Sequence, residues 1–383
     1  MANTLNLGTD GNWATKENSL LGYNSENGNY KPLPFDFTRA SSATVVNKAG
    51  LIETVGNNIP RIDFKDNTNG ALLLEPQKTN LVTYSEDFSS SWASSGTNPP
   101  VLTPSQFISP DGTQNASRLQ IPITNTTSIL QQLFSHTSGE EYTVSAYVKS
   151  NSSSNQEFKL YGDYGVPTGI SGVLIATSEW QRFTFTYTAT GTGSRSGGFY
   201  YVPNTNTDIQ IYGFQAEEGS YPTSYIPTSG SSVTRVAELC SQTPPSGIIG
   251  QTEGTVFVDA ANLFTSGQRT ISLLYTNNSA FYQIYINSSN QVRADVNGTF
   301  IFLGGSIAAN TNYKIAFAYK SGEYALYING TQIATSGMIT MPSSLTNYYV
   351  GNSLSSEQSG AYSQGTLYNT RLSNSELAAL TTI

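Results

Sequence analysis

Long segments of the chain alternate between apolar and polar residues with the period of a β-strand. Side chains two residues apart share one face of a strand, and Tyr142, Val144, Ala146 and Val148 are spaced in this way. The same period recurs in residues 180–189, 208–219 and 324–328. Clusters of Gly, Ser and Asn separate these segments. The pattern predicts an all-β protein built from antiparallel β-sandwiches.

Two local signals predict further elements near the end of the chain. The dipeptide Asn329-Gly330 follows an alternating segment and favours a type I′ turn, which predicts a β-hairpin there. Ser373 or Asn374 can cap a short helix that carries Glu376 in its first turn. The sequence therefore predicts a single short helix after the last strands.

Length and composition predict more than one domain. The chain has 383 residues, more than one β-rich core usually holds. Only 11% of the residues are charged, and 24 Tyr and 17 Phe are present, a composition that suits half-buried strands. We predict an irregular N-terminal segment, an antiparallel sandwich, a linker around Pro244-Pro245 and a second antiparallel sandwich. Their predicted bounds are residues 1–79, 80–238, 239–253 and 254–383, respectively.

Charge and cysteine content narrow the classes of partner. The formal net charge is −8 with no basic stripe, which argues against nucleic acid as a partner. Cys240 is the only cysteine, so we expect no disulfide within the chain.

We also expect no secretory signal, because the start MANTLNLGTDGNW has neither a cationic nor an apolar stretch. No apolar run is long enough for a membrane helix, so no membrane insertion is expected.

Several segments resemble known proteins. FDFTRASSATVVNKAGLIETVGNNIPRIDF, followed by GALLLEPQKTNLVTYSEDFSSSW, resembles a segment of bacteriophage virion proteins of the tail-fibre or head-fibre type. YTVSAYVKS and IYGFQAEEGSYPTSYIPTSGSSVTRVAE continue that resemblance into a domain similar to carbohydrate-binding-module jelly rolls. YKIAFAYKSGEYALYINGTQIAT resembles concanavalin A-like, laminin-G-type sandwiches. The resemblance implies a virion location, with assembly in the host cytoplasm and exposure on the particle surface.

Aromatic clusters are the candidate glycan-binding sites. Sugars stack their apolar faces on aromatic rings, and neighbouring polar groups hold the hydroxyls. Tyr is also enriched in subunit interfaces, so these rings could instead mediate contacts between proteins. The candidate residues are Tyr161, Tyr164, Tyr200, Tyr201, Tyr348, Tyr349 and Asn352.

The sequence offers little for catalysis or metal binding. His136 is the only histidine and is interpreted as a loop residue, because no nucleophile or zinc motif accompanies it. No carboxylate pair has the pattern of a glycosidase, so we predict no enzyme activity. The jelly-roll resemblance implies one candidate structural calcium site, at Glu86, Asp87 and Glu217; no other cofactor is predicted.

Together these observations predict a non-catalytic phage virion structural protein. In the first interpretation it is a fibre or adhesin component whose sandwiches contact host surface glycans. In the alternative it is a capsid or tail decoration protein that binds only other virion proteins. In both, residues 1–79 attach to other virion proteins, and a homo-oligomer is expected.

Overall fold

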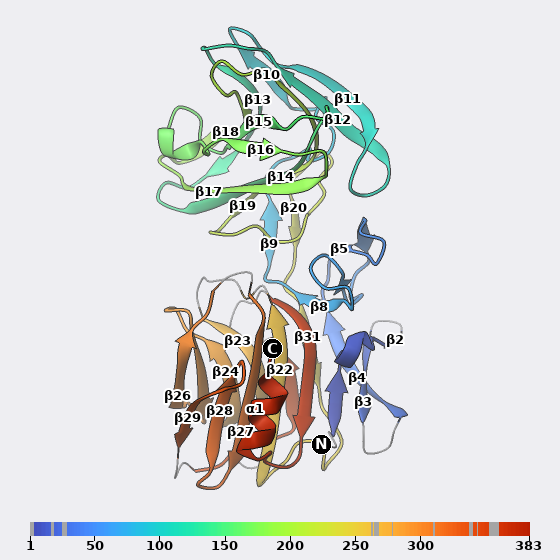
Figure 1. Cartoon of the computed structure of the whole chain (residues 1–383), viewed down its shortest axis with the longest axis vertical. Coiled ribbons are helices and arrows are strands. Elements are labelled where there is room, and N and C mark those ends of the chain that lie inside the picture. Colours follow the sequence, from blue (N-terminus) through green and yellow to red (C-terminus); the bar gives the residue numbers. More distant parts are fainter. Residues whose placement is uncertain are drawn as a thin grey trace. The chain divides into compact units, whose positions relative to one another are not determined.

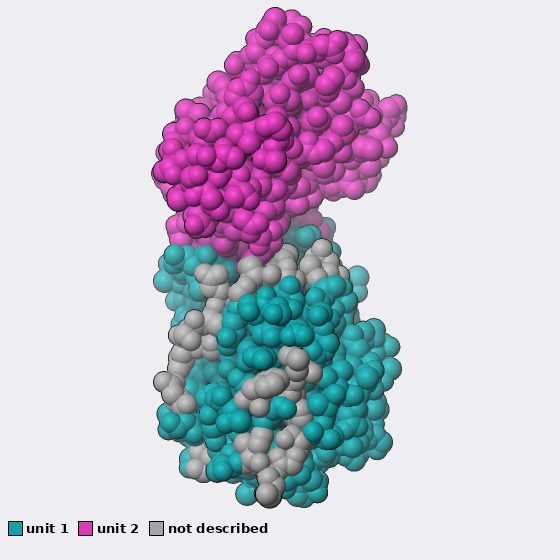
Figure 2. Space-filling view, turned by 90° about the vertical axis from the view of Figure 1, so that its left-hand side faces the viewer, with its two compact units in different colours: residues 1–49, 55–77, 236–383 teal, residues 50–54, 78–235 magenta. Residues whose placement is uncertain are grey.

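The computed structural model describes residues 4–383 apart from several short gaps. The gaps are residues 17–18, 25–28, 262, 264–267, 278, 309–310, 337–339, 343 and 352–359. The chain forms two compact units (Figures 1 and 2). Unit 1 contains residues 1–49, 55–77 and 236–383, and unit 2 contains residues 50–54 and 78–235. The predicted all-β class is confirmed.

Unit 2 is a sandwich of two five-stranded antiparallel sheets. One has the strand order β10-β13-β18-β15-β16, and the other has the order β11-β12-β19-β14-β17. The short strands β9 and β20 pair separately. The bounds are β9 Lys78–Asn80, β10 Ala93–Gly96, β11 Val101–Ile108, β12 Gln114–Ile121, β13 Ser128–His136, β14 Glu141–Ser150, β15 Gln156–Tyr161, β16 Leu174–Ala176, β17 Gln181–Thr188, β18 Gly193–Tyr200, β19 Thr207–Glu218 and β20 Val233–Arg235, with a 3-10 turn at Pro167–Gly169.

The core of unit 2 is filled from both sheets. Val144 and Val148, which lie on the apolar face predicted for β14, are fully buried. The Trp92 ring, only 9% exposed, packs between Phe88 and Phe214, with ring centroids 4.9 and 5.1 Å away. Such aromatic contacts contribute both buried area and preferred ring geometry.

The chain after β19 covers part of the outer face of the sheet that contains β19. The amide of Ile226 donates to Gln215 Oε1 at 2.6 Å, and the amide of Thr223 donates to Glu217 Oε2 at 2.9 Å. The Tyr225 ring lies 5.6 Å from that of Tyr212. The chain segment after β19 therefore covers part of this outer face.

Unit 1 is a second antiparallel sandwich. Its strands before unit 2 are β1 Leu5–Leu7, β2 Thr15–Lys16, β3 Ser19–Asn24, β4 Asn29–Thr38, β5 Ala43–Val46, β7 Ile62–Asp63 and β8 Ala71–Leu74, with a 3-10 turn at Thr9–Gly11, whereas β6 Ile52–Val55 belongs mainly to unit 2. Those after it are β21 Leu239–Gln242, β22 Glu253–Ala261, β23 Arg269–Asn277, β24 Ala280–Ile286, β25 Gln291–Val296, β26 Thr299–Ser306, β27 Tyr313–Lys320, β28 Tyr324–Ile328, β29 Thr331–Ser336, β30 Asn347–Val350 and β31 Gly360–Tyr368.

Strands from the first 79 residues belong to the sandwich formed by the end of the chain. β1 and β8 both pair with β31, and β4 pairs with β21, which in turn pairs with β30. The structure thus differs from the predicted irregular segment at 1–79 and the predicted linker at 239–253, because both supply strands to unit 1. Short strands satisfy their backbone groups only beside partners, and these partners lie far away in sequence.

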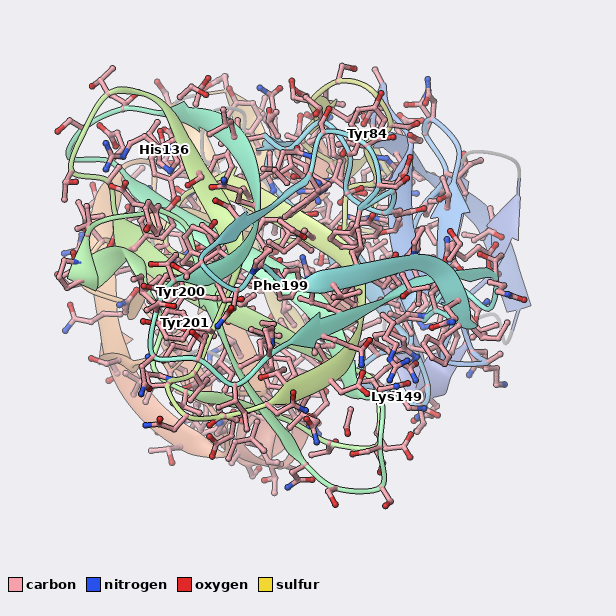
Figure 3. The ribbon with its side chains drawn as sticks, turned by 90° about the horizontal axis from the view of Figure 1, so that it is seen from above. Tyr84, His136, Lys149, Phe199, Tyr200 and Tyr201 are labelled. Carbon is pink, nitrogen blue, oxygen red and sulfur yellow. The ribbon has the colours of Figure 1, made fainter. Side chains whose placement is uncertain are left out.

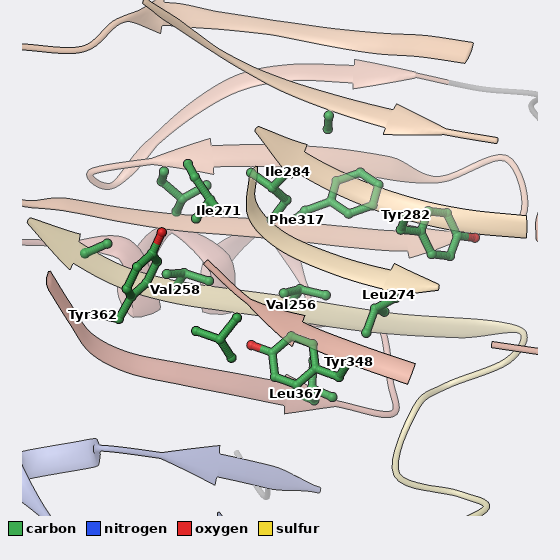
Figure 4. Close-up of a cluster of buried hydrophobic side chains, with 14 of the residues drawn as sticks. Val256, Val258, Ile271, Leu274, Tyr282, Ile284, Phe317, Tyr348, Tyr362 and Leu367 are labelled. Carbon is green, nitrogen blue, oxygen red and sulfur yellow. The ribbon is translucent and has the colours of Figure 1, made fainter. Parts of the chain in front are cut away.

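The core of unit 1 lies between its strand layers and is rich in Val, Ile and Tyr (Figure 4). Val256 and Val258 of β22 are buried, and the Tyr282 ring stacks on that of Tyr319 with centroids 4.2 Å apart. On the other face of β22, Phe257 joins the cluster that contains Leu377 of the terminal helix. The sandwich is therefore closed on that face by this helix.

The predicted hairpin and terminal helix are confirmed. β28 and β29 pair across Asn329 and Gly330, whose φ angles of 48° and 78° fit the predicted turn. Helix α1, Asn374–Thr381, begins with a capping box in which Ser373 and Glu376 bond each other's backbone amides. Among the described residues, no helix has the length and apolar character needed to cross a membrane.

Four charged residues form a buried cluster in unit 1. Glu238 accepts hydrogen bonds from Arg39 Nη1 at 2.7 Å, from Arg61 Nε at 2.8 Å and from the Glu75 amide at 2.9 Å. Arg61 also donates to Glu75 Oε2 at 2.9 Å. Burial alone would lower the pKa of Arg61, but the charges of Glu238 and Glu75 hold it above its ordinary value. We call this set the ion cluster.

Candidate functional site

Four of the candidate tyrosines lie together on the outer face of one sheet of unit 2. The Tyr161 ring is edge-on to those of Tyr200 and Tyr164, with centroids 5.6 and 6.2 Å away. Tyr200 stacks on Tyr201, with centroids 4.8 Å apart and ring planes 28° apart. Figure 3 shows the rings of Tyr200 and Tyr201 side by side. We call these four residues the aromatic patch.

Strand register explains why the rings meet. Phe199, between β13 and β15, is fully buried in the core, so the next residue, Tyr200, faces outward. Tyr200 lies opposite Ile129 on one side and Lys159 on the other. Tyr161, two residues beyond Lys159, shares that outward face. The two sequence clusters that contain Tyr161 and Tyr200 thus form one surface.

The four rings differ in accessibility. Tyr161 is fully buried beneath its neighbours, whereas Tyr164 is 40% exposed and Tyr200 and Tyr201 are half-buried. A ligand can therefore reach Tyr164, Tyr200 and Tyr201, while Tyr161 supports them from below. Burial raises the pKa of Tyr200 to about 12, so its hydroxyl stays neutral and can both donate and accept a hydrogen bond.

An ion pair fixes the loop that carries Tyr164. Arg195 Nε donates to the fully buried carboxylate of Asp163, which also accepts from the amide of Thr190 at 3.2 Å. Burial alone would raise the pKa of Asp163, but the hydrogen bonds from Arg195 and Thr190 lower it below its ordinary value. The Tyr164 amide donates to Ser196 O at 3.3 Å. Asp163 therefore positions Tyr164 and is occupied by protein partners.

A glycine makes the close approach of β13 and β18 possible beside the patch. A Cβ atom at Gly198 would lie 2.1 Å from the carbonyl oxygen of Leu130. Gly198 is directly opposite Gln131 on β13 and Tyr161 on β15. Any side chain there would displace the strand that carries Tyr200, so the patch geometry depends on this glycine.

Polar and apolar side chains surround the rings on the same outer face. Gln131 and Lys159 are half-buried there, and the Thr127 hydroxyl lies 3.4 Å from that of Tyr164. Leu133 and Ile175 are 60% and 50% exposed. The face therefore offers stacking surfaces, hydrogen-bonding groups and exposed aliphatic groups.

The other candidate aromatic cluster lies in unit 1 and forms a smaller surface. Tyr348 is fully buried in the core, so the structure corrects its assignment as a contact residue: its side chain points between the sheets. Tyr349 points the other way, is half-buried and stands edge-on to Tyr275 with centroids 6.3 Å apart. Asn352 lies outside the described residues.

The three carboxylates expected to share calcium have different partners. Glu86 accepts hydrogen bonds from the hydroxyls of Tyr212 and Tyr225, both at 3.0 Å. Exposed Asp87 accepts from the amide of Ser89 at 3.0 Å. The described residues contain no group of three His, Cys, Asp or Glu side chains that could bind a metal.

Glu217, the third of these carboxylates, is fully buried and satisfied locally. It accepts a hydrogen bond from the hydroxyl of Thr223 and another, at 2.9 Å, from its amide. The structure thus corrects the proposed calcium site, because Glu217 fixes the chain after β19 and Asp87 caps a turn.

His136 is a buried residue of β13, not the loop residue expected from the sequence. Its Nε2 lies 2.6 Å from the hydroxyl of Tyr187, and its Nδ1 lies 3.2 Å from the carbonyl oxygen of Phe134. The ring packs against Tyr142 with centroids 4.8 Å apart. Both ring nitrogens therefore have structural partners.

Protonation of His136 should destabilise unit 2. Burial lowers the pKa of His136 below its ordinary value of 6.5. As pH falls through 6.5, the unfolded chain binds the proton first, so stability present above that pH is progressively lost. In urea unfolding followed by circular dichroism, we expect wild type to lose more stability between neutral and mildly acidic pH than His136→Phe does. Equal losses in the two proteins would contradict this role.

Comparisons with known proteins find a family similarity in the C-terminal region. A family model described as the concanavalin A-like lectin/glucanases superfamily, of laminin-G type, matches residues 255–379. This part of unit 1 is similar to concanavalin A-like, laminin-G-type domains. None of the curated proteins matches the chain.

Several solved structures show limited similarity to this chain. The CBM40 of Ruminococcus gnavus IT-sialidase, bound to α2,3-sialyllactose, is 16% identical in sequence and has a TM-score of 0.31. The match covers 35% of this chain and 84% of the CBM40 chain. Domain 4 of the arabinanase AbnA from Geobacillus stearothermophilus, in complex with arabinotriose, is 11% identical, with a TM-score of 0.34, covering 43% and 82%. A heptameric pentraxin from Limulus polyphemus is 14% identical, with a TM-score of 0.28, covering 33% and 69%.

Proposed function

We propose that the protein is a non-catalytic glycan-binding protein that uses the aromatic patch of unit 2. The observation that carries the proposal is the accessible group of Tyr164, Tyr200 and Tyr201 on one sheet face. The ion pair of Asp163 with Arg195 and the stacking of the Tyr rings hold this group in place before a ligand arrives. Preorganised aromatic surfaces lose little entropy on binding.

The surroundings of the patch suit a sugar. A pyranose ring has an apolar face that can stack on a Tyr ring, and its hydroxyl groups need hydrogen-bonding partners. Gln131 and Lys159 lie on the same face as Tyr200. Lys159 of β15 is directly opposite Tyr200, and Gln131 of β13 is opposite Gly198, two residues before Tyr200. The patch therefore combines both elements of sugar recognition.

A polysaccharide and glycan array tests this function with the full chain. We expect binding to at least one bacterial surface glycan, without release of reducing ends, because the proposed role involves no hydrolysis. Circular dichroism on the same sample verifies the fold. The absence of binding to every glycan by the folded protein would overturn the proposal, and newly released reducing ends would show an enzyme instead.

The biological setting is proposed to be a phage particle. The segments FDFTRASSATVVNKAGLIETVGNNIPRIDF and GALLLEPQKTNLVTYSEDFSSSW support this proposal through their resemblance to virion proteins. There the protein would be an oligomeric fibre or adhesin component that faces host glycans, with residues 1–79 contacting other virion proteins. Labelling of particles with antibodies against unit 2 tests this location, and unlabelled intact particles would count against it.

Exposed aliphatic residues favour a second candidate function. Leu133 and Ile175 share the outer face with the patch and are 60% and 50% exposed. Exposed apolar groups next to Tyr rings are also typical of protein interfaces. In this alternative the face binds a neighbouring particle protein only. The glycan array separates the two functions, because a protein-only surface binds no polysaccharide.

A further inference from the structure

A polar cavity of about 450 Å³ lies within unit 1. The segments that line it are far apart in the sequence but adjacent in the fold. The lining residues come from within the segments 8–11, 63–71, 259–261, 312–314 and 361–364. Residues before and after unit 2 in the sequence thus build the cavity jointly, which is why no local sequence motif indicates it.

Strand register places three polar side chains in a row on the cavity floor. Asp259 of β22 is directly opposite Lys314 of β27 on one side and Gln364 of β31 on the other. Its neighbours in sequence, Val258 and Ala260, are buried in the core, so Asp259 points away from the core. Directly opposite residues have Cβ atoms about 5 Å apart. A carboxylate, an amine and an amide therefore lie side by side.

The two polar side chains directly opposite Asp259 donate hydrogen bonds to other groups. Lys314 Nζ donates to Thr382 O at 3.0 Å, and Gln364 Nε2 donates to Thr366 Oγ1 at 2.8 Å. Within the described parts of the chain, no residue donates a hydrogen bond to Asp259. Burial raises the pKa of its carboxyl group. A half-buried carboxylate of this kind gains from a ligand that brings donors.

Tight loop packing fixes the cavity walls. A Cβ atom at Gly11 would lie 2.8 Å from that of Asn69, and one at Gly8 would lie 2.5 Å from Ser363 O. Asn67 Nδ2 donates to Ser363 Oγ at 3.0 Å, which ties the loop before β8 to β31. The walls are therefore held in place by the fold.

Charge and size define the class of ligand. Among the described residues, the cavity is lined by four carboxylates, those of Asp10, Asp63, Asp66 and Asp259, and by one amine, that of Lys314. This excess of negative charge disfavours anionic ligands. The described side chains also contain no metal-binding group of three acids. A volume of about 450 Å³ lies within the range of small-molecule sites.

We propose that this cavity is a second binding site, which takes a single sugar unit without negative charge. The hydroxyl groups of such a sugar donate to Asp259 and accept from Lys314, and further hydroxyls reach the Asn and Gln side chains of the walls. The site is formed entirely within unit 1 and does not depend on the aromatic patch.

Titration with monosaccharides tests the cavity in the full-length Tyr200→Ala variant, in which the central ring of the aromatic patch is removed. The probes are glucose, galactose and glucosamine, with N-acetylneuraminic acid as the anionic control, measured by calorimetry and by ligand-observed NMR. We expect at least one of the first three to bind and the anionic sugar not to bind. Asp259→Asn should weaken binding by about tenfold or more, because a hydrogen bond to a charged group is lost. Gln364→Ala should weaken it as well.

Asp295→Asn is the matched control for the cavity. Asp295 is another half-buried carboxylate of unit 1, on β25, and does not line the cavity. Thermal melts verify that each variant is folded. The proposal is overturned if none of the three sugars binds, if Asp295→Asn weakens binding as much as Asp259→Asn, if the anionic sugar binds equally well, or if EDTA abolishes binding. None of these outcomes bears on the aromatic patch, because the Tyr200→Ala protein lacks its central ring and the cavity variants lie in unit 1.

Discussion

Replacement of Glu238 by alanine is expected to lower the free energy of unfolding of unit 1 by about 3–5 kcal/mol. Glu238 accepts hydrogen bonds from Arg39, Arg61 and the amide of Glu75. Its removal leaves the Arg39 guanidinium buried without the Glu238 carboxylate, beside carbonyl oxygens such as Gly56 O at 2.7 Å. A buried guanidinium without a carboxylate pays a large desolvation cost. Chemical denaturation of the full chain measures the loss.

Two further variants make the interpretation of Glu238→Ala specific. Glu238→Gln keeps the size and hydrogen-bonding oxygen but removes the charge, so we expect a smaller but clear loss. Glu323→Ala removes an exposed glutamate that lies 3.7 Å from Arg371, and exposed pairs contribute little. Similar small losses for Glu238→Ala and Glu323→Ala would show that the ion cluster is not a major source of stability.

Replacement of Tyr200 by alanine is expected to weaken binding of a recognised glycan by about 1–3 kcal/mol. This corresponds to roughly a 5- to 150-fold rise in Kd. The Tyr200 ring contacts both Tyr161 and Tyr201, so the variant removes the central ring of the patch and the stacking contact that holds Tyr201. Calorimetry with an oligosaccharide found on the array measures the change.

The phenylalanine variant separates stacking from hydrogen bonding at this position. Tyr200→Phe keeps the ring and should retain most of the affinity if stacking dominates. Tyr349→Ala removes a half-buried ring from unit 1 and should leave affinity for the same oligosaccharide unchanged. Unchanged affinity in Tyr200→Ala, or equal losses in Tyr200→Ala and Tyr349→Ala, would rule out the patch as the binding surface.

Local sequence signals predicted individual elements of the fold well. The alternating segment at residues 141–150 is β14, and the turn at Asn329-Gly330 has the positive φ angles that its residues favour. The cap at Ser373 follows from chemistry within one turn of helix. Each of these features depends on residues close together in sequence, so periodicity and turn propensity suffice to find them.

Features that depend on distant pairing were not predictable from these signals. β1 and β8 are short, and their apolar residues are buried only because β31 lies beside them. The ion cluster joins Arg39 to Glu238, which are 199 residues apart. A single sequence does not encode such pairings as a local pattern, and the first 79 residues therefore read as irregular.

The candidate site was partly accessible to sequence reasoning. Consecutive aromatic residues on a strand must point to opposite faces, so one ring next to Phe199 had to face outward, and this is Tyr200. The convergence of Tyr161 with Tyr200 depends on the neighbouring positions of β15 and β18, which periodicity does not reveal. The burial of Tyr348 likewise depends on which face of β30 meets the core.

The pairing of β1 with β31 sets the order in which the protein can fold during translation. The Thr366 hydroxyl of β31 donates a hydrogen bond to Asn6 Oδ1 of β1, 360 residues earlier in the chain. The earliest strands therefore leave the ribosome long before their partner strand has been synthesised. Strands β9 to β20 come from one continuous stretch, so that part can fold while the rest is still being made. Until β31 emerges, the N-terminal strands have unpaired edges, and such edges favour association with other chains.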